Sequence, residues 1–135
     1  SQSANRCALG GYRLRAAAGP RKVVFVATGS EVALAVECAA ALEAQGIGAD
    51  VVSMPCMELF DAQPDSYKAD VLPADALIVS VEAGSTLGWE RYTSRSGINI
   101  GLDTFGASAP AEDLFAHFGF TADKIVPQIL NKLNA

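Results

Sequence analysis

The stretch VVFVATGSEVALAVECAAAL, residues 23–42, decides the fold class. Its first five residues form a continuous β-prone apolar run, which is typical of a strand buried on both faces of a parallel sheet. From Val32 to Leu42 the apolar residues recur at helical spacing, so this half predicts an amphipathic helix. Gly46 and Gly48 indicate the end of that helix, because glycine supplies the backbone freedom that a helix C-terminus often needs.

The loop between this strand and helix, Thr28-Gly29-Ser30-Glu31, allows two interpretations. Thr28 with Glu31 three residues later matches a capping box, in which each side chain pairs with an orphan backbone N–H group. The alternative is a phosphate site, since the loop follows a strand and precedes a helix N-terminus. The loop has one glycine and no P-loop lysine, and Glu31 would repel an anion, so capping is favoured.

The rest of the chain alternates strands with helices. The apolar patterns predict strands over residues 51–54, 77–81 and 98–102. They also predict a short helix within residues 61–72 and helices over residues 85–93, from 108 onward and 121–133. Tyr12–Leu14 is a candidate for an additional edge strand. Such alternation predicts an α/β fold with helices on both faces of a mostly parallel sheet. We expect an N-terminal arm, residues 1–21, that holds the edge strand, and an α/β domain over residues 22–135.

The composition argues against two classes of function, nucleic-acid binding and membrane insertion. The chain has 135 residues, of which 50% are hydrophobic and 19% charged, enough apolar material for one core. Its net charge is -5 and it has no cluster of Lys and Arg, so we expect no nucleic-acid binding. No apolar run reaches the length of about eighteen residues needed to span a bilayer, so we expect no membrane partner.

Three cysteines, Cys7, Cys38 and Cys56, are an odd number without CxxC spacing, which favours neither a zinc site nor a disulfide framework. Reduced thiols of an intracellular protein are the simpler interpretation. The N-terminus has no apolar signal-peptide core, and we expect a cytoplasmic location. The chain also begins without Met, which suggests processing or excision from a longer polypeptide.

Glu82 and His117 are two further candidates for a catalytic group. Glu82 ends a predicted strand at the carboxyl edge of the sheet, where it could act as an acid or base, cap a helix near Ser85, or pair with Arg91 or Arg95. No second titratable group accompanies it in sequence. His117, the single histidine, lies near a helix end, where it can interact with the dipole without any function. We therefore expect no catalytic, cofactor-binding or metal-binding residue in this chain.

Three sequence motifs resemble those of a known protein family. VATGSEV, residues 26–32, followed by VVSMP, residues 51–55, resembles the opening of the transketolase C-terminal domain. TFGASAPAE, residues 104–112, with the aromatic residues that follow it, resembles that domain's final signature. VEAG, residues 81–84, lies between them in the expected order. The resemblance runs from about Tyr12 to Leu130.

The resemblance implies a large homodimeric enzyme that uses thiamine diphosphate and a divalent metal (Mg or Ca). It transfers a two-carbon ketol unit between sugar phosphates, in the pentose phosphate pathway. For this domain it implies a three-layer α/β sandwich with about five strands, of which Tyr12–Leu14 would be the antiparallel edge strand. The cofactor-binding GDG motif and the catalytic histidines of the family belong to other domains, and His117 matches no catalytic position.

The function that the resemblance implies is architectural: a domain that packs with the remaining transketolase domains and a second subunit, and is inactive alone. Two alternatives stay open. One is a regulatory module that binds a nucleotide or phosphate at Thr28–Glu31, and the other is a docking domain for another protein, as in the homologous domain of 2-oxoacid dehydrogenases. The signature over Phe105–Phe120 is expected to be structural, since each of its residue types has a packing or turn explanation.

Overall fold

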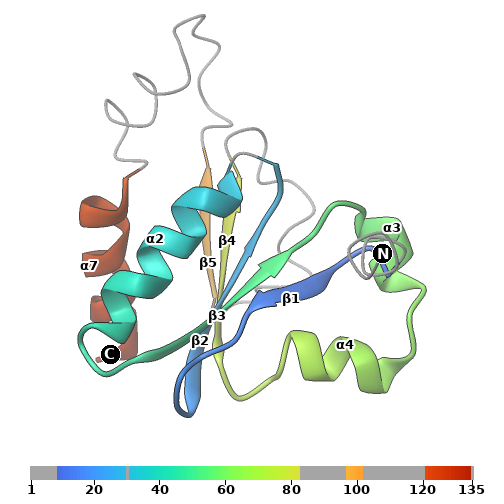
Figure 1. Cartoon of the computed structure of the whole chain (residues 1–135), viewed down its shortest axis with the longest axis horizontal. Helices are drawn as coiled ribbons and strands as arrows, with labels where there is room; N and C mark the ends of the chain where they lie inside the picture. Colours follow the sequence, from blue (N-terminus) through green and yellow to red (C-terminus); the bar gives the residue numbers. More distant parts are fainter. Residues whose placement is uncertain (1–8, 30, 83–96, 102–120, 135) are drawn as a thin grey trace, which may run out of the picture.

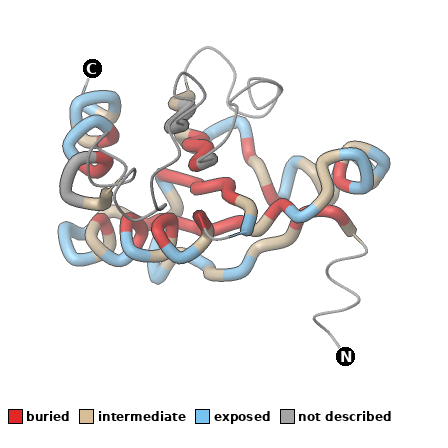
Figure 2. The backbone as a smooth tube through the Cα atoms, turned by 90° about the horizontal axis from the view of Figure 1, so that it is seen from above, coloured by how far each residue is buried: buried red, intermediate tan, exposed pale blue. Residues whose placement is uncertain are grey.

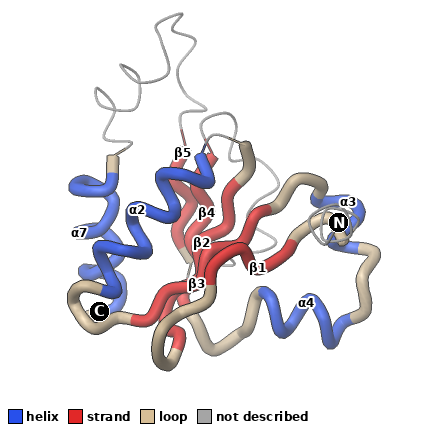
Figure 3. The backbone as a smooth tube through the Cα atoms, in the orientation of Figure 1, coloured by secondary structure: helices blue, strands red, loops and turns tan. Residues whose placement is uncertain are grey.

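The computed structural model describes residues 9–29, 31–82, 97–101 and 121–134, which form one five-stranded sheet with helices on both faces (Figures 1 and 3). Its strands are β1 (Tyr12–Arg15), β2 (Arg21–Ala27), β3 (Gly48–Ser53), β4 (Leu77–Glu82) and β5 (Ile98–Gly101). Its helices are α2 (Glu31–Glu43), α3 (Met57–Asp61), α4 (Asp65–Val71) and α7 (Ala122–Leu133).

The strand order is β1-β3-β2-β4-β5, which places the first strand of the chain at one edge and β2 in the centre. Strands β3, β2, β4 and β5 are parallel, whereas β1 is antiparallel to β3. The predicted α/β sandwich with one antiparallel edge strand is therefore confirmed. Within the described ranges, no helix has the length and apolar character required to cross a membrane.

The central position of β2 explains its uninterrupted apolar sequence. Val23, Val24, Phe25, Val26 and Ala27 are all fully buried. β2 has a strand on each side and helices over both faces. Its side chains are therefore buried on both faces of the sheet, and apolar residues are favoured at every position. Figure 2 shows buried residues gathered at the centre of the sheet, with many of the exposed residues on the outer helices and turns.

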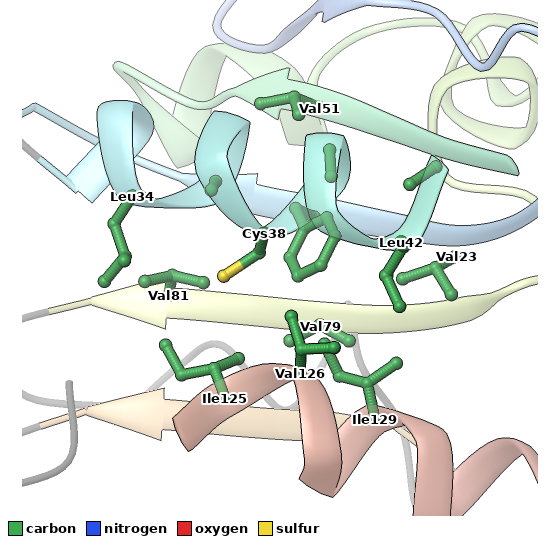
Figure 4. Close-up of a cluster of buried hydrophobic side chains, with 14 of the residues drawn as sticks. Val23, Leu34, Cys38, Leu42, Val51, Val79, Val81, Ile125, Val126 and Ile129 are labelled. Atoms are coloured by element: carbon green, nitrogen blue, oxygen red, sulfur yellow. The ribbon is translucent and has the colours of Figure 1, made fainter. Parts of the chain in front are cut away.

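Two apolar cores lie on opposite faces of the sheet. One is formed under α2 and α7, where Phe25, Val79 and Val81 of the sheet meet Leu42 and Ile125 (Figure 4). The other lies under α3 and α4, where Val24, Val26 and Val52 pack with Met54, Phe60 and Val71. The alternation of side chains along each strand thus supplies both layers.

Helix α2 confirms the predicted helix, with a buried face slightly different from the predicted one. That face consists of Leu34, Ala35, Cys38, Ala39 and Leu42, whereas the predicted members Val32 and Val36 are half-buried. The helix ends in a Schellman motif: Gly46 has φ 80°, its N–H bonds to the Glu43 carbonyl, and the Ile47 N–H bonds to the Leu42 carbonyl. Gly46 therefore has the role expected from sequence.

The short helix predicted within residues 61–72 is confirmed as α4. A second short helix, α3, precedes α4, and residues 62–64 separate the two. Pro64 lies at the N-cap of α4 with an extended ψ of 148°, and proline also disfavours a helical conformation in the residue before it, so the first helix cannot continue. The predicted helices over 85–93 and from 108 onward lie outside the described residues.

Candidate functional site

The carboxyl ends of the parallel strands meet at one edge of the sheet, where α/β proteins commonly bind ligands (Figure 1). Thr28 and Gly29 follow β2 at this edge, and Glu31 opens α2. Glu31 is only 6% exposed, and its Oε2 lies 3.8 Å from the position that a Cβ of residue 29 would occupy. A carboxylate thus lies against the loop at the helix N-terminus, where a phosphate would have to bind, and the two anions would repel each other.

The capping box expected at this loop is wrong in its geometry. Gly29 has a left-handed φ of 56°, so it cannot be the first residue of the helix, and α2 begins at Glu31. The loop instead forms turns in which the N–H groups of Glu31 and Val32 bond to the Thr28 and Gly29 carbonyls, at 3.2 and 3.3 Å. Thr28 therefore lies before the N-cap position, although it makes contacts of its own.

Of the other two candidate residues, Glu82 is described by the structure and His117 lies outside the described residues. Glu82 is the last residue of β4, and its backbone lies opposite Gly101 of β5, at the predicted edge of the sheet. The residues weighed as its partners, Ser85, Arg91 and Arg95, lie outside the described residues, as does His117. The final signature lies outside them up to Thr121, the N-cap residue of α7, whose side chain makes no cap hydrogen bond.

A buried ionic cluster, missed by sequence reasoning, ties the N-terminal arm to the sheet. Asp50 of β3 is 2% exposed, and its Oδ2 accepts hydrogen bonds from Arg13 Nε at 3.0 Å and Arg21 Nη1 at 2.9 Å. Its Oδ1 accepts a bond from the Ala17 N–H at 2.7 Å. We call these groups the Asp50 cluster. Because both carboxylate oxygens accept hydrogen bonds within the chain and the residue is buried, Asp50 acts as an anchor.

The sequence carried a signal for this cluster. Asp50 directly precedes the apolar run at Val51 and Val52, where a strand would bury it, and a buried carboxylate requires a partner. The partners are arginines of the arm, Arg13 in β1 and Arg21 at the start of β2. Arg13 reaches further, to the Asp70 carbonyl at 2.8 Å and its carboxylate at 3.3 Å, and so links β1 to α4.

A second carboxylate, that of Glu43, binds backbone N–H groups of the arm and of β3. Its Oε1 accepts hydrogen bonds from the Ala49 N–H at 3.0 Å and the Ala18 N–H at 3.2 Å. These two bonds stabilise the ionised form and lower the pKa of Glu43 below its ordinary value. Glu43 lies at the end of α2, so this contact joins helix, arm and β3 at one point.

Cys38 does not have the character of a reactive thiol. Cys38 lies on the buried face of α2 and is fully buried. Burial, with a smaller contribution from nearby Glu37, raises the pKa of its thiol to about 12. It therefore stays protonated at neutral pH and is a poor nucleophile. Among the residues that the structure describes, no group of three or more His, Cys, Asp or Glu side chains could hold a metal ion.

Comparisons with known proteins agree with this architecture. Residues 10–121 match the family described as "Transketolase-like TK C-terminal domain". The chain is 49% identical over 130 residues to the transketolase of Sinorhizobium medicae, covering 96% of this chain and 19% of that protein. It is thus similar to about a fifth of the length of that relative.

Solved structures give the same result. The Leishmania mexicana transketolase superposes with a TM-score of 0.82 at 45% identity, covering 92% of this chain and 18% of that one. The Pichia stipitis transketolase, solved with sedoheptulose-7-phosphate, has a TM-score of 0.86 at 40% identity, covering 96% of this chain and 19% of that one. The chain therefore belongs to the transketolase family and corresponds to its C-terminal domain.

Proposed function

We propose that this chain is the architectural C-terminal domain of a transketolase and does not catalyse ketol transfer alone. The parent enzyme would be a thiamine-diphosphate- and metal-dependent homodimer that moves two-carbon units between sugar phosphates. The Pichia stipitis relative, solved with sedoheptulose-7-phosphate, supports that substrate class. Cofactor, substrate and second subunit are assigned here to the parent enzyme.

The observation that carries this proposal is the match of residues 10–121 to the C-terminal domain of enzymes about five times longer. The Asp50 cluster adds support from within the chain, because its charged groups are used to hold the arm to the sheet. Both Asp50 and Glu43 bind backbone N–H groups of the arm, at Ala17 and Ala18. We propose that the arm, residues 1–21, and the α/β domain, residues 22–135, work as one rigid unit.

We also propose a cytoplasmic location for the parent enzyme. Cys38 and Cys56 are free thiols, as expected in a reducing compartment. Tagging the full-length protein and following it through cell fractionation tests this assignment. Recovery in a membrane or secreted fraction would contradict it.

Two measurements on the isolated chain test the architectural role. Isothermal titration with thiamine diphosphate and Mg²⁺ should show no specific heat, and a coupled assay with ketose and aldose phosphates should show no ketol transfer. The full-length enzyme, assayed in parallel, should bind the cofactor and turn over. A micromolar dissociation constant for the cofactor, or turnover by the isolated chain, would show that this domain holds an active site of its own.

A further inference from the structure

Residues 12–18, which we call the clamped segment, are joined to the domain by strand pairing and polar contacts. The segment consists of β1 and the three alanines after it, and Leu14, Ala16 and Ala18 in it are exposed. Within the described ranges, neither apolar core includes a residue of this segment, and nor do the half-buried side chains packed against the cores. The segment can therefore leave the sheet without opening a core.

Both ends of the clamped segment are fixed by contacts that do not involve the segment itself. Before it, the Gly10 carbonyl accepts a hydrogen bond from the Cys56 N–H at 2.9 Å, and the Gly11 carbonyl accepts one from the Tyr67 hydroxyl at 2.7 Å. After it, Arg21 begins β2, which pairs with β3 on one side and with β4 on the other. Movement of the segment away from β3 therefore leaves the chain on either side of it in place.

Two carboxylates hold adjacent backbone N–H groups at the end of the clamped segment. Asp50 Oδ1 accepts a hydrogen bond from the Ala17 N–H at 2.7 Å, and Glu43 Oε1 accepts one from the Ala18 N–H at 3.2 Å. Asp50 belongs to β3 and Glu43 is the last residue of α2, so two separate elements hold the segment here. Hydrogen bonds to an ionised carboxylate are stronger than those to a neutral acceptor, so both contacts weaken when the carboxylates are protonated.

Charged groups from five elements surround the two carboxylates. They are Arg13 and Arg15 of β1, Arg21 of β2, Glu43 of α2, Asp50 of β3 and Asp70 of α4. Arg13 Nε and Arg21 Nη1 lie 3.0 and 2.9 Å from Asp50 Oδ2, and Arg15 acts on Glu43 through its charge. Guanidinium groups keep their charge in acid, so protonation of the carboxylates leaves three like charges close together. Their repulsion favours departure of β1, which carries two of them.

We propose that the clamped segment is an acid-sensitive element of the fold: protonation of Glu43 and Asp50 releases residues 12–18 from β3, while β2, β3, β4 and both cores stay folded. At neutral pH the segment remains bound and the arm and the domain form one unit. Release leaves the outer edge of β3 without its antiparallel neighbour, and an open strand edge can pair with another strand.

The sign of the pH dependence follows from Glu43. Hydrogen bonds from the Ala49 and Ala18 N–H groups lower the pKa of its carboxyl below the ordinary value of 4.5. The ionised carboxylate therefore stabilises the bound segment above pH 4.5, and this contribution is lost as the pH falls through the lowered pKa. Release is thus expected on acidification below pH 4.5.

Amide hydrogen exchange, followed by NMR on the whole 135-residue chain from pH 7 to pH 3, tests this proposal. Each rate is compared with the intrinsic rate at the same pH to give a protection factor. Below pH 4.5 the amides of β1, Ala17 and Ala18 should lose protection together, by about tenfold or more, while those of Val24, Phe25 and Val26 keep theirs. Parallel loss in β1 distinguishes release of the segment from the loss of two hydrogen bonds.

Two variants remove one charge each at neutral pH. Glu43→Gln and Asp50→Asn should both lower the protection of the clamped segment at pH 7 and reduce its further response to acid. Glu37→Gln is the matched control, because Glu37 is an exposed carboxylate of the same helix as Glu43, and it should behave as the unaltered chain. Protection of the β2 amides reports whether each variant is folded, and Glu43→Gln provides the test if Asp50→Asn unfolds.

Four results would overturn the proposal. Loss of protection in the segment and in β2 over the same pH range would show that the whole domain unfolds at once. Unchanged protection down to pH 3 would show that the segment is not acid-sensitive, and a loss confined to Ala17 and Ala18 would show that β1 stays paired. A Glu43→Gln chain that responds to acid as Glu37→Gln does would show that Glu43 does not control the segment.

Discussion

Replacing Asp50 with Asn should weaken the fold more than removing any other single charge that contacts the arm. The carboxylate accepts three hydrogen bonds, from Arg13 Nε, Arg21 Nη1 and the Ala17 N–H. An amide of the same shape keeps one oxygen, which can still accept from Ala17. It loses the negative charge that faces both guanidinium groups.

The loss of unfolding free energy expected for Asp50→Asn depends on how deeply the ion pairs are buried. Removing one partner of a buried ion pair costs roughly 3–5 kcal/mol, because the remaining charge is left uncompensated. Asp50 is 2% exposed, but the side chains of Arg13 and Arg21 retain 30% and 25% of their exposure. These arginines can turn toward water, so we expect a loss of about 2–3 kcal/mol, below the range for a fully buried pair.

Urea unfolding at pH 7, followed by circular dichroism, measures this loss. Asp70→Asn is the matched control: Asp70 pairs with the same Arg13 at 3.3 Å, but its side chain is 66% exposed. It should cost no more than about 1 kcal/mol. Equal losses in the two variants would refute the reasoning, since they would show that burial of the carboxylate does not set the strength of the cluster.

Three other predictions follow from single residues. Gly10→Ala should cost at least about 1–3 kcal/mol of unfolding free energy, because φ is 81° and a Cβ has no room; Gly19→Ala, which meets nothing within 4 Å, should stay within about 0.5 kcal/mol. Cys38 has a folded pKa raised from 9.0 to about 12, so its protonated form stabilises the fold. The stability of the chain relative to Cys38→Ala should therefore fall as pH rises from about 9 to about 12, and an unchanged difference would contradict this. Glu43 has a lowered pKa, so its contribution is present above its ordinary value of 4.5 and is lost as pH falls. The stability difference between the chain and Glu43→Gln should shrink on acidification below pH 4.5, and a difference that grows would contradict the assignment.

Much of the fold could be predicted from the sequence because the central strands have strong apolar patterns. The run at 23–27 and the segment at 77–81 appear in the structure as β2 and β4, within one or two residues at each end. The edge strand β1 was visible only weakly in Tyr12-Arg13-Leu14, since edge strands bury less and show less alternation. Its antiparallel direction came from the family resemblance.

The failures have local causes. Within residues 61–72 the scattered apolar positions predict a short helix but not its bounds, and Pro64 at the N-cap sets the start of α4 at Asp65. At Thr28 the capping-box spacing was correct, but a positive φ at Gly29 moves the start of the helix two residues along, which the spacing alone cannot show. The Asp50 cluster joins residues 29 and 37 positions apart in sequence, so its partners depend on strand order.

Ketol transfer by the full-length enzyme carrying Asp50→Asn tests the architectural role most directly. Turnover is normalised to bound thiamine diphosphate, and the folded fraction is measured from the melting curve of the same sample. An architectural domain predicts a lower melting temperature with turnover per loaded active site nearly unchanged. An unchanged melting temperature with lost turnover would place Asp50 in the reaction itself and contradict the proposed function.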